Sequence, residues 1–75
     1  SGGNALIRLG LAQALLASGN DADLAPATDQ LEAALTKERK SPQLWRLLAT
    51  AYGRENNLGM AAYALAEEAA ARGDD

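Results

Sequence analysis

An internal repeat restricts the folds open to this chain more than any other feature of its sequence. Residues 11–15 read Leu-Ala-Gln-Ala-Leu and residues 48–52 read Leu-Ala-Thr-Ala-Tyr, a spacing of 37 residues (48 − 11). Three further apolar residues recur at a spacing of 34 residues (58 − 24): Leu24, Ala27 and Leu31 are matched by Leu58, Ala61 and Leu65. An insertion of three residues, Asp21 to Asp23, explains the difference between the two spacings. A period of about 34 residues indicates a helix-turn-helix repeat.

The composition favours helices and excludes several kinds of chemistry. Alanine and leucine dominate the apolar residues and phenylalanine is absent, so the 75 residues favour one small all-α domain. The chain contains neither Cys nor His. Disulfides, zinc sites, a Cys–His pair and a Ser–His–Asp triad are therefore excluded, and we expect no metal, no cofactor and no enzymatic activity.

Charge and hydropathy narrow the range of partners. The net charge is −3, and the basic residues form no stripe that could follow a phosphate backbone, so we expect no nucleic-acid partner. No apolar run approaches the ~18 residues of a membrane span. Because helix-turn-helix repeats usually present a surface to another protein, a protein or a peptide is the expected partner.

Helix start and stop signals divide the chain into four antiparallel helices, at about residues 4–18, 24–37, 42–55 and 58–72. Asn4 and Ser41 are expected N-caps, Pro42 fits the first turn, and Gly19 and Gly73 are expected to end helices. Residues 1–3 are expected to be a disordered end or a remnant of cloning, and residues 4–75 a single domain. Its first repeat covers about residues 4–40 and its second about 41–73.

Helical periodicity assigns a buried face to each of the last three helices. The second helix is expected to bury Leu24, Ala27, Leu31, Ala34 and Leu35. The third is expected to bury an arc of Leu44, Trp45, Leu47, Leu48, Ala49, Ala51 and Tyr52. The fourth is expected to bury Leu58, Ala61, Ala62, Leu65 and Ala69. Trp45 and Tyr52 are interpreted as core residues and not as a binding platform.

The residues of the second repeat resemble the tetratricopeptide repeat (TPR). Seven positions match that pattern in type and spacing: Pro42, Trp45, Leu48, Ala49, Tyr52, Ala61 and Leu65. The first repeat is a weaker match, because Arg8 and Leu15 stand where Trp and Tyr are expected. The resemblance implies two TPR repeats that form a short right-handed solenoid segment. Glu68 departs from the small residue expected there and is predicted to face solvent.

A narrower resemblance covers most of the chain. Residues 45–54, 59–62 and 64–67, with residues 6–9 and 12–16 before them, resemble the C-terminal repeat region of bacterial periplasmic zinc metallopeptidases. The catalysis of that family needs a His-Glu-x-x-His motif in a separate domain, and this chain has no His. The resemblance therefore implies the non-catalytic, substrate- or partner-binding part of such an enzyme, in the periplasm.

In TPR arrays the first helices of successive repeats line a concave groove, and the resemblance carries this surface over to eight residues: Leu6, Leu9, Gln13, Leu16, Gln43, Arg46, Thr50 and Arg54. Such a groove is apolar on one side and cationic on the other. We expect it to receive a protein segment with apolar side chains and a carboxylate. The alternative for Arg46 and Arg54 is the solvated face of an amphipathic helix. The carboxylate clamp of chaperone-binding repeats is absent, because Thr50 stands where that clamp needs Asn.

Two readings of function remain open. The first is a protein-interaction module, and the second is a structural spacer or homodimerisation unit of an unrelated TPR protein. Repeat arrays normally need about three units for stability, whereas this chain has two. We therefore expect a marginally stable monomer, or a weak homodimer that covers the alanine-rich last helix.

Overall fold

The computed structural model describes residues 2–73, and these residues form an all-α domain. Its four helices are α1 (Gly2–Ala17), α2 (Leu24–Leu35), α3 (Pro42–Arg54) and α4 (Leu58–Arg72). A short 3-10 helix, η1 (Asp21–Asp23), lies between α1 and α2. The expected all-α class is confirmed, and the described residues contain no strand.

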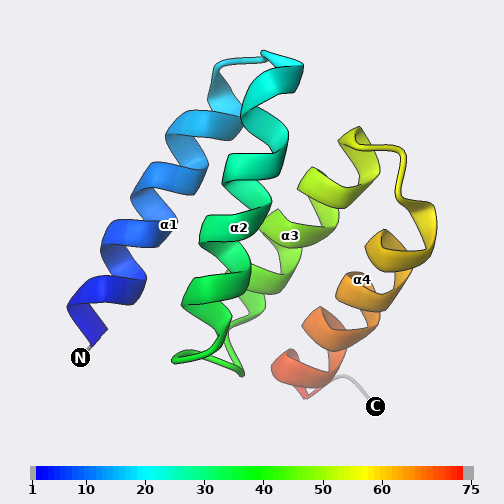
Figure 1. Ribbon diagram of the computed structural model, residues 1–75. Coiled ribbons are helices and arrows are strands. Elements are labelled where there is room, and N and C mark those ends of the chain that lie inside the picture. Colours follow the sequence, from blue (N-terminus) through cyan, green and yellow to red (C-terminus); the bar gives the residue numbers. More distant parts are fainter. Residues whose placement is uncertain (1, 74–75) are drawn as a thin grey trace.

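The helices form a row in chain order, with α1 and α4 at its two ends (Figure 1). The closest contacts join α1 to α2, α2 to α3, and α3 to α4. Successive helices run in opposite directions because the loops between them are short (Figure 1). The result is a helical repeat-like domain that measures 35 × 31 × 16 Å.

Local capping explains where the helices of the second repeat begin and end. The hydroxyl of Ser41 accepts a hydrogen bond from the Leu44 amide at 3.2 Å, and Pro42 occupies the first turn, as the sequence predicts. Asn57 caps α4 in the same way through the Met60 amide. Gly73 ends α4 with φ at 81°, a left-handed conformation that carries no Cβ penalty for glycine.

The first repeat differs from the prediction at its helix ends. Helix α1 begins at Gly2, so Asn4 lies inside the helix and is not its N-cap, and Gly2 and Gly3 are helical. Ser1 lies outside the described residues. Asp23 occupies the N-cap position of α2 but makes no capping hydrogen bond, because its carboxylate accepts the Ser18 hydroxyl at 2.6 Å. The insertion is thus held by its contact with the end of α1.

The buried faces of α2 and α3 agree with the predicted periodicity. All five apolar residues predicted for α2 are buried, and Leu31 is the largest fully buried side chain. On α3 the buried residues are Leu44, Leu48, Ala49, Ala51 and Tyr52. Close approach of the helices depends on small residues such as Ala12 and Ala27, both fully buried.

The predicted face of α4 is wrong. Leu58, Ala62 and Leu65 are exposed, whereas Ala64 and Glu68 are the buried residues of this helix. Ala61 and Ala69 are half-buried. The equivalent leucines of α2 are buried because α2 has a neighbouring helix on each side, whereas α4 is an end helix that has α3 on one side only (Figure 1).

The two aromatic residues predicted for the core of α3 have different environments. Tyr52 is buried, and its hydroxyl donates a hydrogen bond to the Glu32 carboxylate on α2. Trp45 is only half-buried and packs against the edge of the core. Its indole N–H donates to the Arg39 carbonyl at 2.9 Å, and its ring meets Tyr63 edge-to-face with the centroids 5.7 Å apart. The indole thus lies at the edge of the core because its N–H bonds to the exposed connector before α3.

The free energy of unfolding at alkaline pH should show whether the contact between Tyr52 and Glu32 stabilises the fold. Burial, and then the hydrogen bond to Glu32, raise the pKa of the Tyr52 phenol well above its ordinary value of 10.0. This contribution to stability is fully present below about pH 10 and is lost as the pH rises further, because only the native state favours the neutral phenol. We expect urea-unfolding free energies to fall more steeply above pH 10 for the wild type than for Tyr52→Phe. Tyr63→Phe, at an exposed position, should keep the steep fall; parallel curves for the wild type and Tyr52→Phe would contradict the prediction.

Candidate functional site

The eight predicted groove residues lie on the first helices of the two repeats, four on α1 and four on α3. We call this set the α1–α3 face: Leu6, Leu9, Gln13, Leu16, Gln43, Arg46, Thr50 and Arg54. Six of these residues are exposed, and Leu9 and Leu16 are half-buried. The face is thus open to a partner along most of its length.

At one end of this face the structure brings three of the predicted residues together. Leu6, Leu9 and Gln43 contribute to the walls of a cavity of about 170 Å³ between the N-terminal parts of α1 and α3. Leu6 is 70% exposed, so most of its apolar side chain is in contact with water beside the cavity. Glu38, from the connector before α3, also contributes to the wall and was not predicted. This end is therefore apolar with one acidic group at its edge.

Farther along α3, Arg46 forms an ion pair across to α4. Its Nε donates to both carboxylate oxygens of Glu68, at 2.9 and 3.0 Å. Arg72 donates to the same carboxylate from one turn along α4, at 2.9 Å. Within residues 2–73, the terminal nitrogens of Arg46 have no hydrogen-bond partner, and its side chain is 62% exposed. Arg46 is thus anchored by one nitrogen while the others face solvent.

Glu68 is the buried member of this cluster, which corrects the prediction that it faces solvent. Hydrogen bonds from Arg46, and then from Arg72, hold the pKa of the Glu68 carboxyl below its ordinary value. A carboxylate that is buried in this way needs its partners, because burial without them penalises the charge. Glu68 therefore replaces the small residue of the repeat pattern with a charged link between α3 and α4.

Arg54 and Thr50 complete the α3 half of the face. Arg54 donates through Nη1 to the Leu16 carbonyl at 2.8 Å, which satisfies a carbonyl in the last turn of α1. Thr50 donates its hydroxyl to the Arg46 carbonyl, one turn earlier in the same helix. Both arginines are exposed, and each also donates a hydrogen bond within the domain.

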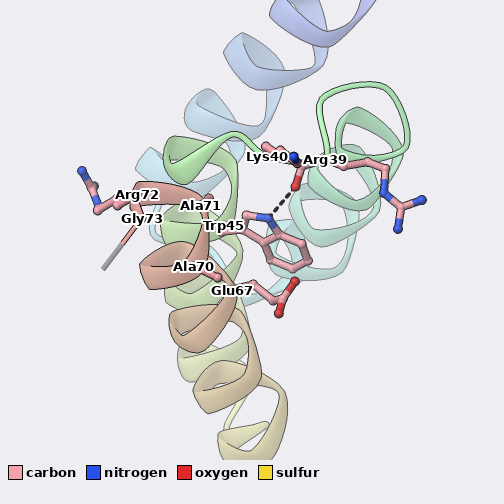
Figure 2. A pocket seen from close by; sticks show the side chains of 8 residues that line it. All are labelled: Arg39, Lys40, Trp45, Glu67, Ala70, Ala71, Arg72 and Gly73. Atoms are coloured by element: carbon pink, nitrogen blue, oxygen red, sulfur yellow. Dashed lines mark hydrogen bonds between the residues drawn. The ribbon is translucent and has the colours of Figure 1, made fainter. Parts of the chain in front are cut away.

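A larger cavity, of about 420 Å³, lies beside Trp45 and was not predicted from the sequence (Figure 2). It lies between the connector before α3 and the last turn of α4, with walls from Arg39, Lys40, Glu67 and Ala70 among others. Figure 2 shows the Arg39 and Arg72 side chains pointing away from the indole on opposite sides. Because these charges do not converge, the cavity has no built site for a small charged ligand.

Residues 2–73 contain no group of three or more acidic, His or Cys side chains placed to hold a metal ion. In the same part of the chain, every helix is too short or too polar to cross a membrane. No family model matches the sequence, and no curated protein or solved structure matches it.

Acid unfolding should isolate the contribution of Glu68. Because its folded-state pKa is lowered, this contribution is fully present above about pH 4.5 and is lost as the pH falls through the folded-state pKa. We expect the thermal midpoint of the wild type to fall further than that of Glu68→Gln between pH 6 and the acid range. Glu67→Gln, at the adjacent half-buried position, is the matched control and should follow the wild type. Equal acid sensitivity of the wild type and Glu68→Gln would show that the cluster does not stabilise the fold.

Proposed function

We propose that this chain is a protein-interaction module: two TPR repeats that form a short right-handed solenoid and bind a protein segment along the α1–α3 face. The helical repeat-like row of four helices and the agreement of α2 and α3 with the predicted faces support this proposal. The chain has neither His nor Cys, which supports a module without catalytic activity or a cofactor of its own.

One observation carries the proposal most directly, namely the exposed apolar side chain of Leu6 beside the cavity between the N-terminal parts of α1 and α3. An apolar side chain of a partner that enters this cavity would cover Leu6 and Leu9 and remove their surface from water. Peptide recognition commonly combines one such apolar anchor with polar contacts nearby.

The charges on the face give the bound segment a direction. Glu38 lies at the cavity and would repel a carboxylate there, whereas Arg46, farther along α3, offers terminal nitrogens that have no hydrogen-bond partner among residues 2–73. We therefore propose that apolar residues of the segment occupy the cavity and that its carboxylate reaches Arg46, with Arg54 nearby on the same helix.

A panel of labelled peptides tests this arrangement. The probes are fluorescein-labelled nonapeptides that contain two leucines followed by one glutamate. The number of residues between the leucines and the glutamate varies across the panel. Each peptide has a control in which glutamine replaces the glutamate. We expect the best glutamate peptide to bind about three- to fivefold more tightly than its glutamine partner in fluorescence anisotropy, the size of an exposed ion pair worth up to ~1 kcal/mol. Arg46→Gln should remove this difference, and Leu6→Glu should weaken both peptides.

Two variants serve as controls. Glu68→Gln breaks the same intramolecular ion pair but keeps the charge of Arg46, so it should keep the preference for the glutamate peptide. Ala25→Glu changes an exposed position on α2 and should bind like the wild type. Absence of measurable binding for every peptide of the panel would reject the proposed groove.

We also propose, from the resemblance of residues 6–9, 12–16, 45–54, 59–62 and 64–67, that the module is the C-terminal, non-catalytic part of a periplasmic zinc metallopeptidase. The gene that encodes the chain should then carry a His-Glu-x-x-His motif upstream of this region, after a signal for export. A gene without this motif would favour the alternative, a structural or homodimerisation unit of an unrelated TPR protein.

A further inference from the structure

Both outer helices of the row expose an apolar face. On α1 this face consists of Ile7, Leu11 and Ala14, which we call the α1 end face. On α4 it consists of Leu58, Ala62 and Leu65, which we call the α4 end face. All six side chains are exposed, among them Ile7 at 71% and Leu58 at 67%. Neither set contains a charged residue, and α1 and α4 lie at opposite ends of the row (Figure 1).

The internal repeat relates the α1 end face to the buried side of α3. The positions 37 residues before Leu44, Leu48 and Ala51, which are their equivalents in the first repeat, are Ile7, Leu11 and Ala14. In α3 these positions are buried, with Leu44 and Leu48 only 3% and 2% exposed. Positions four and three residues apart share one side of a helix, so the α1 end face is the repeat equivalent of a buried side of α3.

The α4 end face has the same relation to α2. Adding the spacing of 34 residues to Leu24, Thr28 and Leu31 gives Leu58, Ala62 and Leu65. All three α2 residues are buried. The Thr28 hydroxyl donates to the Glu55 carboxylate just after α3, which places this side of α2 toward α3. Tyr52, four residues after Leu48 on the same side of α3, donates to Glu32 on α2, so this side of α3 faces α2. The two end faces are therefore equivalent to the two halves of the α2–α3 interface.

The two residues of the Tyr52–Glu32 hydrogen bond also have equivalent positions on the outer helices. Within the chain, Tyr52 donates to Glu32 across this interface. The equivalent positions are Leu15 on α1 (52 − 37) and Ala66 on α4 (32 + 34), so an apolar pair replaces the hydrogen-bonded one. Bringing the two end faces together would therefore leave no buried carboxylate or phenol without a partner at this position.

We propose that the α1 end face of one copy of this chain packs on the α4 end face of a second copy, as α3 packs on α2 within the chain. The second copy is the occupant that these residues indicate, because one chain carries both halves of the interface and the contact continues the existing row. The two faces differ, so the contact is heterologous, and each added copy presents a new free face. The association goes beyond peptide binding at the α1–α3 face and uses different residues of α1.

Sedimentation analysis of two complementary variants tests the proposal. We expect the weight-average mass of the wild type to rise past that of two chains as its concentration increases from roughly 5 to 500 µM, since assembly is governed by mass action. Leu11→Glu blocks the α1 end face and Leu65→Glu blocks the α4 end face. Each variant alone should stay at the mass of one chain. Their equimolar mixture should reach the mass of two chains and stop there, because one intact face of each kind remains.

The two blocking variants must keep the fold, and a third variant controls for the added charge. Leu11 and Leu65 are 46% and 45% exposed, so both variants should keep the helical circular dichroism of the wild type. Ala25→Glu places the same charge on an exposed position of α2, away from both end faces, and should assemble like the wild type. Dimers formed by Leu11→Glu alone would indicate symmetric α4–α4 pairing and overturn the head-to-tail contact. A wild type that stays at the mass of one chain at every concentration would overturn it as well.

Discussion

The contact between α2 and α3 determines the architecture, because it joins two helical hairpins into one domain. Leu31 on α2 is fully buried, and Leu48 on α3 is almost fully buried. Two hydrogen bonds between side chains join α2 to α3 and the residue after it, from Thr28 to Glu55 and from Tyr52 to Glu32. Apolar burial supplies most of the attraction, whereas these directional bonds fix how α2 and α3 are aligned along their length.

The same repeat pattern that builds the α2–α3 interface also determines which surfaces are left for partners. On α1, Leu6 and Leu9 belong to the α1–α3 face, whereas Ile7 and Leu11 belong to the α1 end face. These two sets lie on different sides of one helix, because adjacent residues are about 100° apart around its axis. A peptide in the groove and a second copy at the end of the row therefore need not compete for the same side chains.

Prediction from sequence succeeded for the apolar helix faces that other helices of the chain cover. The faces of α2 and α3 follow from helical periodicity because each of these helices has neighbours on two sides. The same reasoning failed for α4, since Leu58 and Leu65 match residues that are covered elsewhere, yet α4 is an end helix. Periodicity indicates which side of a helix is apolar, but it does not show whether another helix covers that side.

Glu68 shows a second limit of prediction from sequence. Arg72 lies four residues after Glu68 in the same helix, so the sequence itself indicates that these two side chains can form an ion pair. The contact with Arg46 joins residues 22 positions apart and depends on how α3 and α4 pack. The position of Trp45 depends in the same way on the path of the connector, whose Arg39 carbonyl accepts the indole N–H.

At the candidate site, the repeat resemblance predicted that Leu6, Leu9 and Gln43 share one face, and the structure places all three around one cavity. The resemblance did not predict Glu38, because a connector without regular structure has no period from which its direction can be read. The cavity beside Trp45 escaped prediction for the same reason, since Arg39 and Lys40 of this connector form part of its wall.

The narrow dimension of the domain, 16 Å, has a consequence for its internal motions. In so thin a row, α2 and α3 each lie between two helices, whereas α4 packs only on α3, and α1 packs mainly on α2 with a smaller contact to α3. Detaching α4 therefore breaks one interface, and detaching α1 breaks one large interface and one small one, whereas opening the α2–α3 contact separates the two hairpins. Amide hydrogens should consequently exchange with solvent through a graded series of openings, with partial unravelling at both extremities and the slowest exchange in the centre.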